Sequence, residues 1–203
     1  MAKVVVDPMV FYPLQAAVII GANIDSKPDF MASAWGSTVS LKRPMGVGVG
    51  HDTPICKGIL QNMTLSVNIP SFDMVKEVDT LVSVSGAESA NKAKDSKFKV
   101  FYGKLDTAPM IEQCLVNLEF RVEHVIDLES HTQFIGHIEE THVSEDYLTE
   151  GKPDFRKIKP LWFSRVDKED EVDYVYAAME FSLLDPRKIA SVDTATLIRH
   201  PLA

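Results

Sequence analysis

Residues 116–122 read Val-Asn-Leu-Glu-Phe-Arg-Val, and apolar and polar side chains alternate over the whole run. A period of two residues is the pattern of a β-strand that turns one face to a core and the other to water. Strands with one solvent-exposed face are typical of antiparallel sheets, because parallel strands are usually buried on both faces. This stretch therefore predicts an antiparallel sheet with one buried face.

Further strands are expected on both sides of this run. β-Branched or alternating residues bounded by turn residues predict extended segments over 16–24, 31–41, 45–50, 64–69, 133–143 and 161–166. Only short helices are expected between them. Many strands with few helices favour a barrel, because closure removes the exposed sheet edges. We predict a mainly β fold with a few peripheral helices.

Two helices have recognisable starts. Thr53 followed by Pro54 suits an N-cap and a first helical position, so a short helix is expected over 55–61. Ser71 is expected to cap a second helix, whose apolar positions recur at helical spacing: Phe72, Val75, Val78 and Val82.

The chain is expected to form one domain, residues 1–166, and a C-terminal extension, residues 167–203. The extension begins with an acidic stretch that is typical of a solvated linker. Its later apolar residues predict an amphipathic helix that packs on the barrel or on a second subunit: Tyr174, Val175, Ala178 and Phe181.

Composition excludes some classes of protein. The 203 residues carry a net charge of −8 without a basic block, which argues against nucleic-acid binding. No stretch approaches the ~20 apolar residues that a membrane span needs, so no membrane partner is expected. The two cysteines, Cys56 and Cys114, form no C-x-x-C pair, and unpaired thiols fit a cytoplasmic protein.

Glycine occupies one face of the expected strand over 45–50, at Gly46, Gly48 and Gly50. A bare backbone face usually has something lying close against it, either a packed neighbour, a ligand or a dimer partner. The spacing is G-x-G-x-G, which does not match the G-x-G-x-x-G dinucleotide fingerprint.

This strand runs directly into the helix start at Thr53. A strand–helix junction of this kind presents free N–H groups and the positive end of a helix, which suit a phosphate. His51 could add a cation and Thr53 a hydroxyl. Asp52 adds a negative charge and Pro54 removes one donor. An anion site and plain helix capping by Thr53 both remain open.

Trp35 lies among small residues in the run Met-Ala-Ser-Ala-Trp-Gly-Ser. Small neighbours let a planar ring approach the backbone, where an indole can stack on it or donate its N–H. A core position for Trp35 is an equally good interpretation.

Metal and hydrolytic sites receive little support. Four histidines, at 124, 131, 137 and 142, fall on or near two expected strands together with Glu139 and Glu140. They lack the compact spacing of H-E-x-x-H or paired C-x-x-C motifs. There is no G-x-S-x-G elbow either. We expect surface histidines, no metal site and no side chain acting as a catalytic acid, base or nucleophile.

Many short motifs, in a fixed order, resemble the flavin reductase-like family, and within it the flavoredoxins. They begin with Pro28-Asp-Phe-Met-Ala-Ser-Ala-Trp-Gly-Ser, Arg43-Pro-Met, Lys57-Gly-Ile and Leu65-Ser-Val-Asn-Ile-Pro-Ser. They continue with Val84-Ser-Gly, Phe101-Tyr-Gly-Lys-Leu, Ala108-Pro-Met-Ile-Glu, Val116-Asn-Leu-Glu, Ser130-His, Phe134-Ile-Gly and Lys159-Pro-Leu. The resemblance covers residues 10–165.

The resemblance implies an FMN-binding split barrel that forms a homodimer. Electrons would pass from reduced nicotinamide through FMN to a flavin, a metal or a protein, which is an NAD(P)H:flavin oxidoreductase activity. A cation such as Lys92 beside the flavin would stabilise its reduced form. The implied cofactor-binding residues are Ala32, Ser33, Ala34, Trp35, Gly50, His51, Asp52, Thr53, Asn68, Ser85, Lys92, His131 and Phe163.

Two departures from the family keep other functions open. The family carries an Arg/Ser/Thr-rich turn before Lys57-Gly-Ile, whereas this chain has His-Asp-Thr-Pro-Ile-Cys over 51–56. The segment from Lys168 onward also departs from the family. The alternatives are an FMN electron carrier that does not use nicotinamide, and a divergent member that has lost flavin binding.

Overall fold

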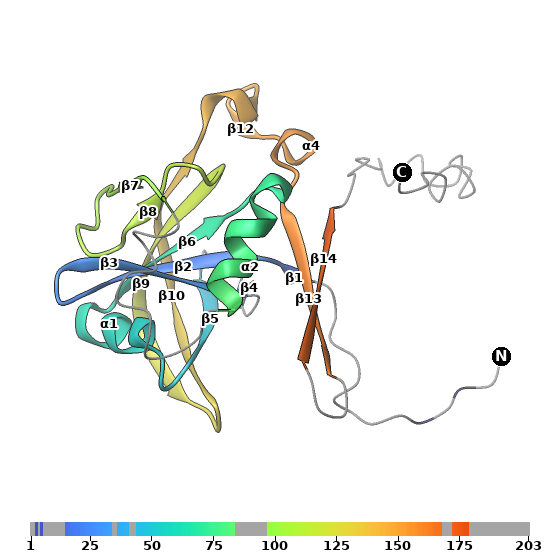
Figure 1. Ribbon diagram of the computed structural model, residues 1–203. Coiled ribbons are helices and arrows are strands. Elements are labelled where there is room, and N and C mark those ends of the chain that lie inside the picture. Colours follow the sequence, from blue (N-terminus) through green and yellow to red (C-terminus); the bar gives the residue numbers. More distant parts are fainter. Residues whose placement is uncertain are drawn as a thin grey trace.

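The computed structural model describes most of the chain and places more than half of the described residues in strands (Figure 1). The described residues are 15–33, 36–40, 44–83, 97–167 and 172–178, together with Lys3 and Val5.

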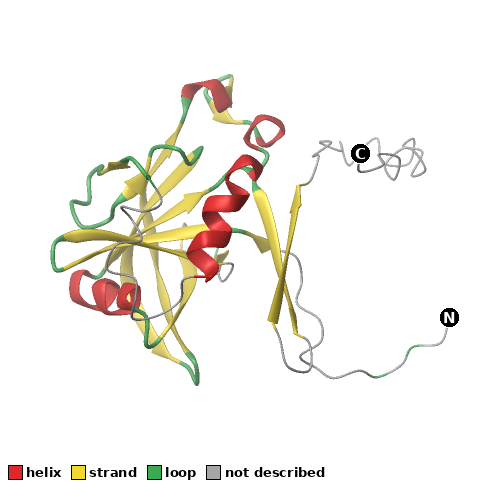
Figure 2. Ribbon diagram, in the orientation of Figure 1, coloured by secondary structure: helices red, strands yellow, loops and turns green. Residues whose placement is uncertain are grey.

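The main sheet has seven strands in the order β3-β2-β6-β9-β10-β5-β4, and every neighbouring pair is antiparallel. It curls on itself, with the helices at its periphery (Figure 2). Its strands are β2 (Val18–Ile24), β3 (Lys27–Ser33), β4 (Gly36–Thr38), β5 (Pro44–Gly50), β6 (Thr64–Ile69), β9 (Val116–Asp127) and β10 (His131–Val143).

Two hairpins organise this sheet. β2 and β3 are joined by Asp25 and Ser26, whose φ angles of 48° and 62° are both positive. Two such residues make the turn whose twist matches the twist of the flanking strands. β9 and β10 form the longest hairpin, and its tip extends beyond the neighbouring strands at the bottom of Figure 1.

A second sheet has the order β1-β13-β14 and is also antiparallel. Its strands are β1 (Gln15–Ala16), β13 (Leu161–Asp167) and β14 (Val172–Ala178). Two small hairpins complete the strands: β7 (Val100–Phe101) with β8 (Met110–Ile111), and β11 (Leu148–Thr149) with β12 (Lys152–Pro153).

The helices are short: α1 (Pro54–Asn62), α2 (Val75–Ser83) and α4 (Phe155–Ile158), with single turns η1 (Phe72–Met74) and η2 (Glu145–Tyr147). Thr53 caps α1, because its side chain accepts a hydrogen bond from the backbone N–H of Cys56. α2 lies between the curled sheet and the β13–β14 hairpin (Figure 1). Among the described residues, no helix is long and apolar enough to cross a membrane.

Two hydrophobic clusters lie on opposite faces of the main sheet. The first contains Ile20 of β2, Phe120 of β9, Phe134 of β10 and residues of α1. The second contains Ile19 of β2 and residues of β3, α2 and β13. Because alternate residues of a strand point to opposite faces, β2 is buried on both sides. Each cluster is close to one group of candidate site residues.

Most of the strand predictions are confirmed. The segments expected over 45–50, 64–69, 133–143 and 161–166 lie within β5, β6, β10 and β13, and the helix expected over 55–61 lies within α1. The single stretch expected over 31–41 is instead two strands with different partners. β3 pairs with β2, and β4 pairs with β5.

The second helix differs from its prediction at its start. The Ser71 side chain makes no capping hydrogen bond, and Phe72 is 41% exposed. Of the predicted positions, Val78 is buried in the second cluster and Val75 packs against it, while Met74 and Leu81 complete the buried stripe.

The predicted C-terminal helix is wrong, because Val172–Ala178 is strand β14. Its backbone pairs with β13 along seven residues, from Leu161 opposite Ala178 to Asp167 opposite Val172. The segment reads Val-Asp-Tyr-Val-Tyr-Ala-Ala, and its β-branched and aromatic residues suit a strand. Phe181 of the same prediction lies outside the described residues.

Candidate functional site

The β5–α1 junction lies beside the tip of the β9–β10 hairpin. Gly50 is directly opposite His131 in the β5–β10 ladder. The backbone N–H of His51 donates to the carbonyl of Ser130 at 3.4 Å, and its Nε2 lies 2.8 Å from the carboxylate of Asp127. The fold therefore brings candidate residues about eighty positions apart into one place.

The Thr53 hydroxyl makes two hydrogen bonds within this junction. Its hydroxyl donates to the carbonyl of Gly50 at 2.8 Å and accepts from the N–H of Cys56 at 3.2 Å. Of the two interpretations of Thr53, helix capping is confirmed. Asp52 is exposed, and the first turn of α1 carries no acidic residue. An anion at this helix end would meet the helix dipole without a buried negative charge.

The glycine face of β5 is buried at Gly46 and Gly48. A Cβ atom at Gly46 would lie 2.5 Å from Nε2 of Gln133 and 3.0 Å from the side chain of Val39. At Gly46 the packed-neighbour interpretation is therefore the correct one. Gly50 is half-buried, and a Cβ there would make only an ordinary contact with Thr53.

A second group of candidate residues borders the second cluster. Ala32 of β3 lies opposite Ile19 and packs against this cluster, as does Phe163 of β13. The ring of Phe163 lies 5.7 Å from that of Tyr176. Ser33 is half-buried at the end of β3. Four candidates lie outside the described residues: Ala34, Trp35, Ser85 and Lys92.

Asn68 is held by hydrogen bonds inside the protein. Its side chain is fully buried, and its amide donates to the carbonyl of Ile19 and to Ser66 Oγ, both at 2.9 Å. Its oxygen accepts from the N–H of Ile111 at 3.0 Å and from Asn117 at 2.7 Å. An amide offers two donors and two lone pairs, so Asn68 is saturated within the protein.

Asn68 belongs to a row of buried polar residues on β6 and β9, of which Asn117 and Glu119 lie on the face that the alternation over 116–122 predicts to be in water. The row lies on the outer face of β6 and β9, away from the first cluster, and binds the segment 104–111 that covers it. Its members are Thr64, Ser66, Asn68, Asn117 and Glu119. The alternation marked Asn117 and Glu119 as polar, but only the covering segment makes them buried.

Glu119 is the charged residue of this row. Its carboxylate has no exposed surface and accepts the N–H of Lys104 at 3.0 Å and that of Leu105 at 2.6 Å. His142 Nε2 lies 2.7 Å from the same carboxylate. The backbone of Gly103 approaches so closely that a Cβ there would overlap Glu119. The Glu119 side chain therefore holds the covering segment by that segment's backbone N–H groups.

The exposed end of the same face carries a charged network. Glu139 accepts from Lys104 at 2.8 Å and from Arg121 at 2.7 Å. The hydrogen bond from Lys104, followed by that from Arg121, lowers the pKa of Glu139 to about 2. Burial raises the pKa of the Cys114 thiol, so Cys114 is not a thiolate nucleophile at neutral pH.

Residues 11–168 match the family described as Flavin reductase like domain, and the chain belongs to this family. It is similar to flavoredoxin from Methanosarcina acetivorans, with 32% sequence identity, a TM-score of 0.80 and coverage of 95% of this chain and 100% of that chain. It is also similar to flavoredoxin of Desulfovibrio vulgaris (Miyazaki F), with 25% identity, a TM-score of 0.78 and coverage of 94% and 100%.

A split barrel domain protein from Shewanella frigidimarina has the same fold. Its TM-score is 0.72 over 85% of this chain and 86% of that chain, at 13% identity. At that identity the likeness concerns the fold alone. The predicted mainly β split barrel is confirmed.

The Glu119 contacts lead to a prediction about stability. Glu119→Gln places an amide NH₂ against a backbone N–H that needs an acceptor, and removes the charge that strengthens both hydrogen bonds. We expect the free energy of unfolding to fall by about 2 kcal/mol or more. Chemical denaturation followed by tryptophan fluorescence measures this loss.

Glu123→Gln is the matched control, on the same strand. The Glu123 side chain is 49% exposed and pairs with His137, so we expect a change within about 0.5 kcal/mol. Equal losses in the two variants would contradict a special role for Glu119.

Proposed function

We propose that this protein holds FMN non-covalently and works as an NAD(P)H:flavin oxidoreductase. The observation that carries this proposal is the match to the Flavin reductase like family over residues 11–168, joined by 32% identity to a flavoredoxin. When bound, FMN would supply the redox chemistry between reduced nicotinamide and a flavin, metal or protein acceptor. The protein would supply position and electrostatics.

The β5–α1 junction fits the anionic end of such a cofactor. The start of α1 offers a positive helix end. Beside it lie two partly exposed histidines, His51 in the turn that follows β5 and His131 at the start of β10. His131 Nδ1 is 2.8 Å from Ser130 Oγ, which orients the imidazole ring. These residues would bind the phosphate, while the Thr53 hydroxyl holds the helix start in place.

The flavin ring of FMN would lie against the second group of candidate residues. Ala32, Ser33 and Phe163 would border the flavin ring. Trp35 would stack on it, and the Lys92 cation would stabilise its reduced form. Asn68 would act indirectly, because all of its amide hydrogen-bonding positions are used inside the protein.

Flavin binding is tested by colour. The purified full-length protein, alone or after incubation with FMN, should show the visible absorption of a bound flavin. Trp35→Ala and Lys92→Ala should each weaken FMN binding about tenfold, or ~1.4 kcal/mol. Fluorescence titration measures this affinity, and Lys76→Ala, an exposed lysine of α2, is the control for Lys92. A colourless protein that takes up no FMN would instead mark a family member that has lost its flavin.

Use of nicotinamide separates an oxidoreductase from an electron carrier. Under anaerobic conditions, NADH or NADPH added to the FMN-loaded protein should bleach the flavin absorption faster than it bleaches free FMN. Stopped-flow absorbance measures both rates. Equal rates for bound and free FMN would contradict the oxidoreductase and leave the electron carrier.

We also propose that the protein is a cytoplasmic homodimer. Three large apolar side chains at the tip of the β9–β10 hairpin, Val125, Ile126 and Leu128, are between 41% and 50% exposed. A projecting apolar group of this kind suits contact with a second copy. Both cysteines are unpaired, as expected in a reducing compartment.

Sedimentation velocity should give the mass of two chains for the purified protein. Ile126→Glu should shift the species toward one chain, because it places a charge in the proposed contact. Glu129→Gln, on the same turn, should leave the dimer intact. A monomeric wild-type protein would contradict the proposal.

A further inference from the structure

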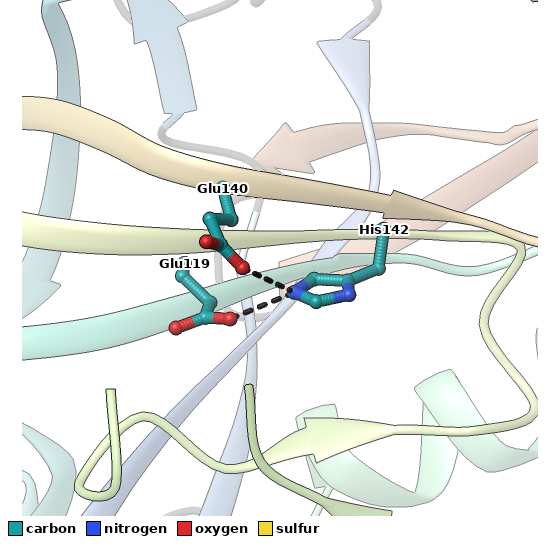
Figure 3. Close-up of side chains that lie close together, drawn as sticks. All are labelled: Glu119, Glu140 and His142. Carbon is teal, nitrogen blue, oxygen red and sulfur yellow. Dashed lines mark hydrogen bonds and ion pairs between the residues drawn. The ribbon is translucent and has the colours of Figure 1, made fainter. Parts of the chain in front are cut away.

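Three side chains from two strands converge on the outer face of the sheet. Nε2 of His142 lies 2.7 Å from Oε1 of Glu119 and 3.8 Å from Oε2 of Glu140. All three atoms lie within 4.8 Å of one another. Figure 3 shows the two carboxylates pointing at the same imidazole nitrogen.

A β-bulge creates this arrangement. Ile138 pairs with Phe120, but Glu140 pairs with Glu119, so Glu139 is an extra residue in β10. Residues directly opposite in a ladder share a face of the sheet. Ile138 therefore shares the core face with Phe120, whereas Glu140 shares the outer face with Glu119. A bulge re-aims side chains in this way, and bulges are frequent beside functional sites.

The donor atoms are held in place before any ligand arrives. Two backbone N–H groups fix the Glu119 carboxylate, at 3.0 Å and 2.6 Å. The ring of Phe101 packs edge-on against the His142 imidazole, with 5.7 Å between the ring centres. Carboxylates that bind metals are characteristically held by hydrogen bonds from outside the site, as the Glu119 carboxylate is here.

The cluster is open to solvent on one side and rich in negative charge. Glu119 is fully buried, but the side chains of His142 and Glu140 are 33% and 47% exposed. In the described part of the chain, the ion pairs of Glu119 and Glu140 run only to His142. The nearby cations Lys104 and Arg121 both pair with Glu139. The hydrogen bond and charge of Glu139, and then the charge of Glu140, raise the pKa of Lys104.

We propose that Glu119, Glu140 and His142 bind one divalent transition-metal ion of the Zn²⁺ type. The ligands are two carboxylate oxygens and one imidazole nitrogen, and the ion takes the place of the proton between His142 and Glu119. Bonds of about 2.0–2.2 Å place such ligand atoms roughly 3–4 Å apart. The 3.8 Å separation of His142 and Glu140 lies in this range, and the 2.7 Å hydrogen bond between His142 and Glu119 would lengthen as the ion enters. The imidazole favours a transition metal over Mg²⁺ or Ca²⁺.

A protonated His142 shared by two carboxylates has similar geometry without a metal, and titration with Zn²⁺ separates the two. The full-length protein, freed of metal with a chelator, should bind one equivalent of Zn²⁺ by isothermal titration calorimetry. Glu140→Gln and His142→Gln should each weaken binding at least tenfold. Both positions are partly exposed, so these variants should fold, and circular dichroism checks this.

The control is the other histidine–carboxylate pair on the same two strands. His137 Nδ1 lies 3.0 Å from Glu123, and Glu123→Gln should leave Zn²⁺ binding unchanged. Saturating Zn²⁺ should also raise the Tm of the wild-type protein and not that of His142→Gln, because a ligand stabilises the state that binds it. If the wild type binds Zn²⁺ no more tightly than His142→Gln, the proposal is overturned, and the cluster is a hydrogen-bonded triad.

Discussion

A carboxylate with no exposed surface lies in the middle of the outer face of the sheet, where Glu119 accepts two backbone N–H groups and meets His142. Removing a carboxylate from water costs several kcal/mol, and only close charge-assisted hydrogen bonds offset that cost. The partners of Glu119 include the main chain of Lys104 and Leu105, so its burial and the path of the covering segment depend on each other. Without the covering segment, the Glu119 carboxylate would be exposed. Without the carboxylate, the N–H groups of Lys104 and Leu105 would lose their acceptor.

Asn68 is also hydrogen-bonded to the covering segment, and this contact bears on its role. A conspicuous asparagine between two strands of a flavin-binding fold suggests a cofactor contact. Its amide joins β2, β6 and β9 to the N–H of Ile111 in the covering segment, so its full hydrogen-bonding capacity is used inside the protein. The candidate residues at the β5–α1 junction and around Ala32 and Phe163 lie outside this buried polar row.

Much of this architecture could be predicted from residue patterns. Alternation over 116–122 identified a strand, and Thr53-Pro54 identified a helix start, because both are local signals with a local physical cause. The C-terminal helix was wrong since Val172–Ala178 suits either state by spacing, and only pairing with β13 decides between them. The cluster of Glu119, Glu140 and His142 was missed because an extra residue at Glu139 reverses which residues share a face.

By itself, the sequence determined the class of fold, the positions of most strands and the family, since alternation, turn residues and ordered motifs are written along the chain. Only the tertiary structure decided which polar residues are buried. Asn117 and Glu119 have the pattern of a solvent-exposed face, but the segment 104–111 covers them together with Thr64 and Ser66, which lie about forty residues earlier in the chain. The physical reason is that burial depends on what packs over a residue, and neither that contact nor a bulge in a ladder leaves a periodic mark in the sequence.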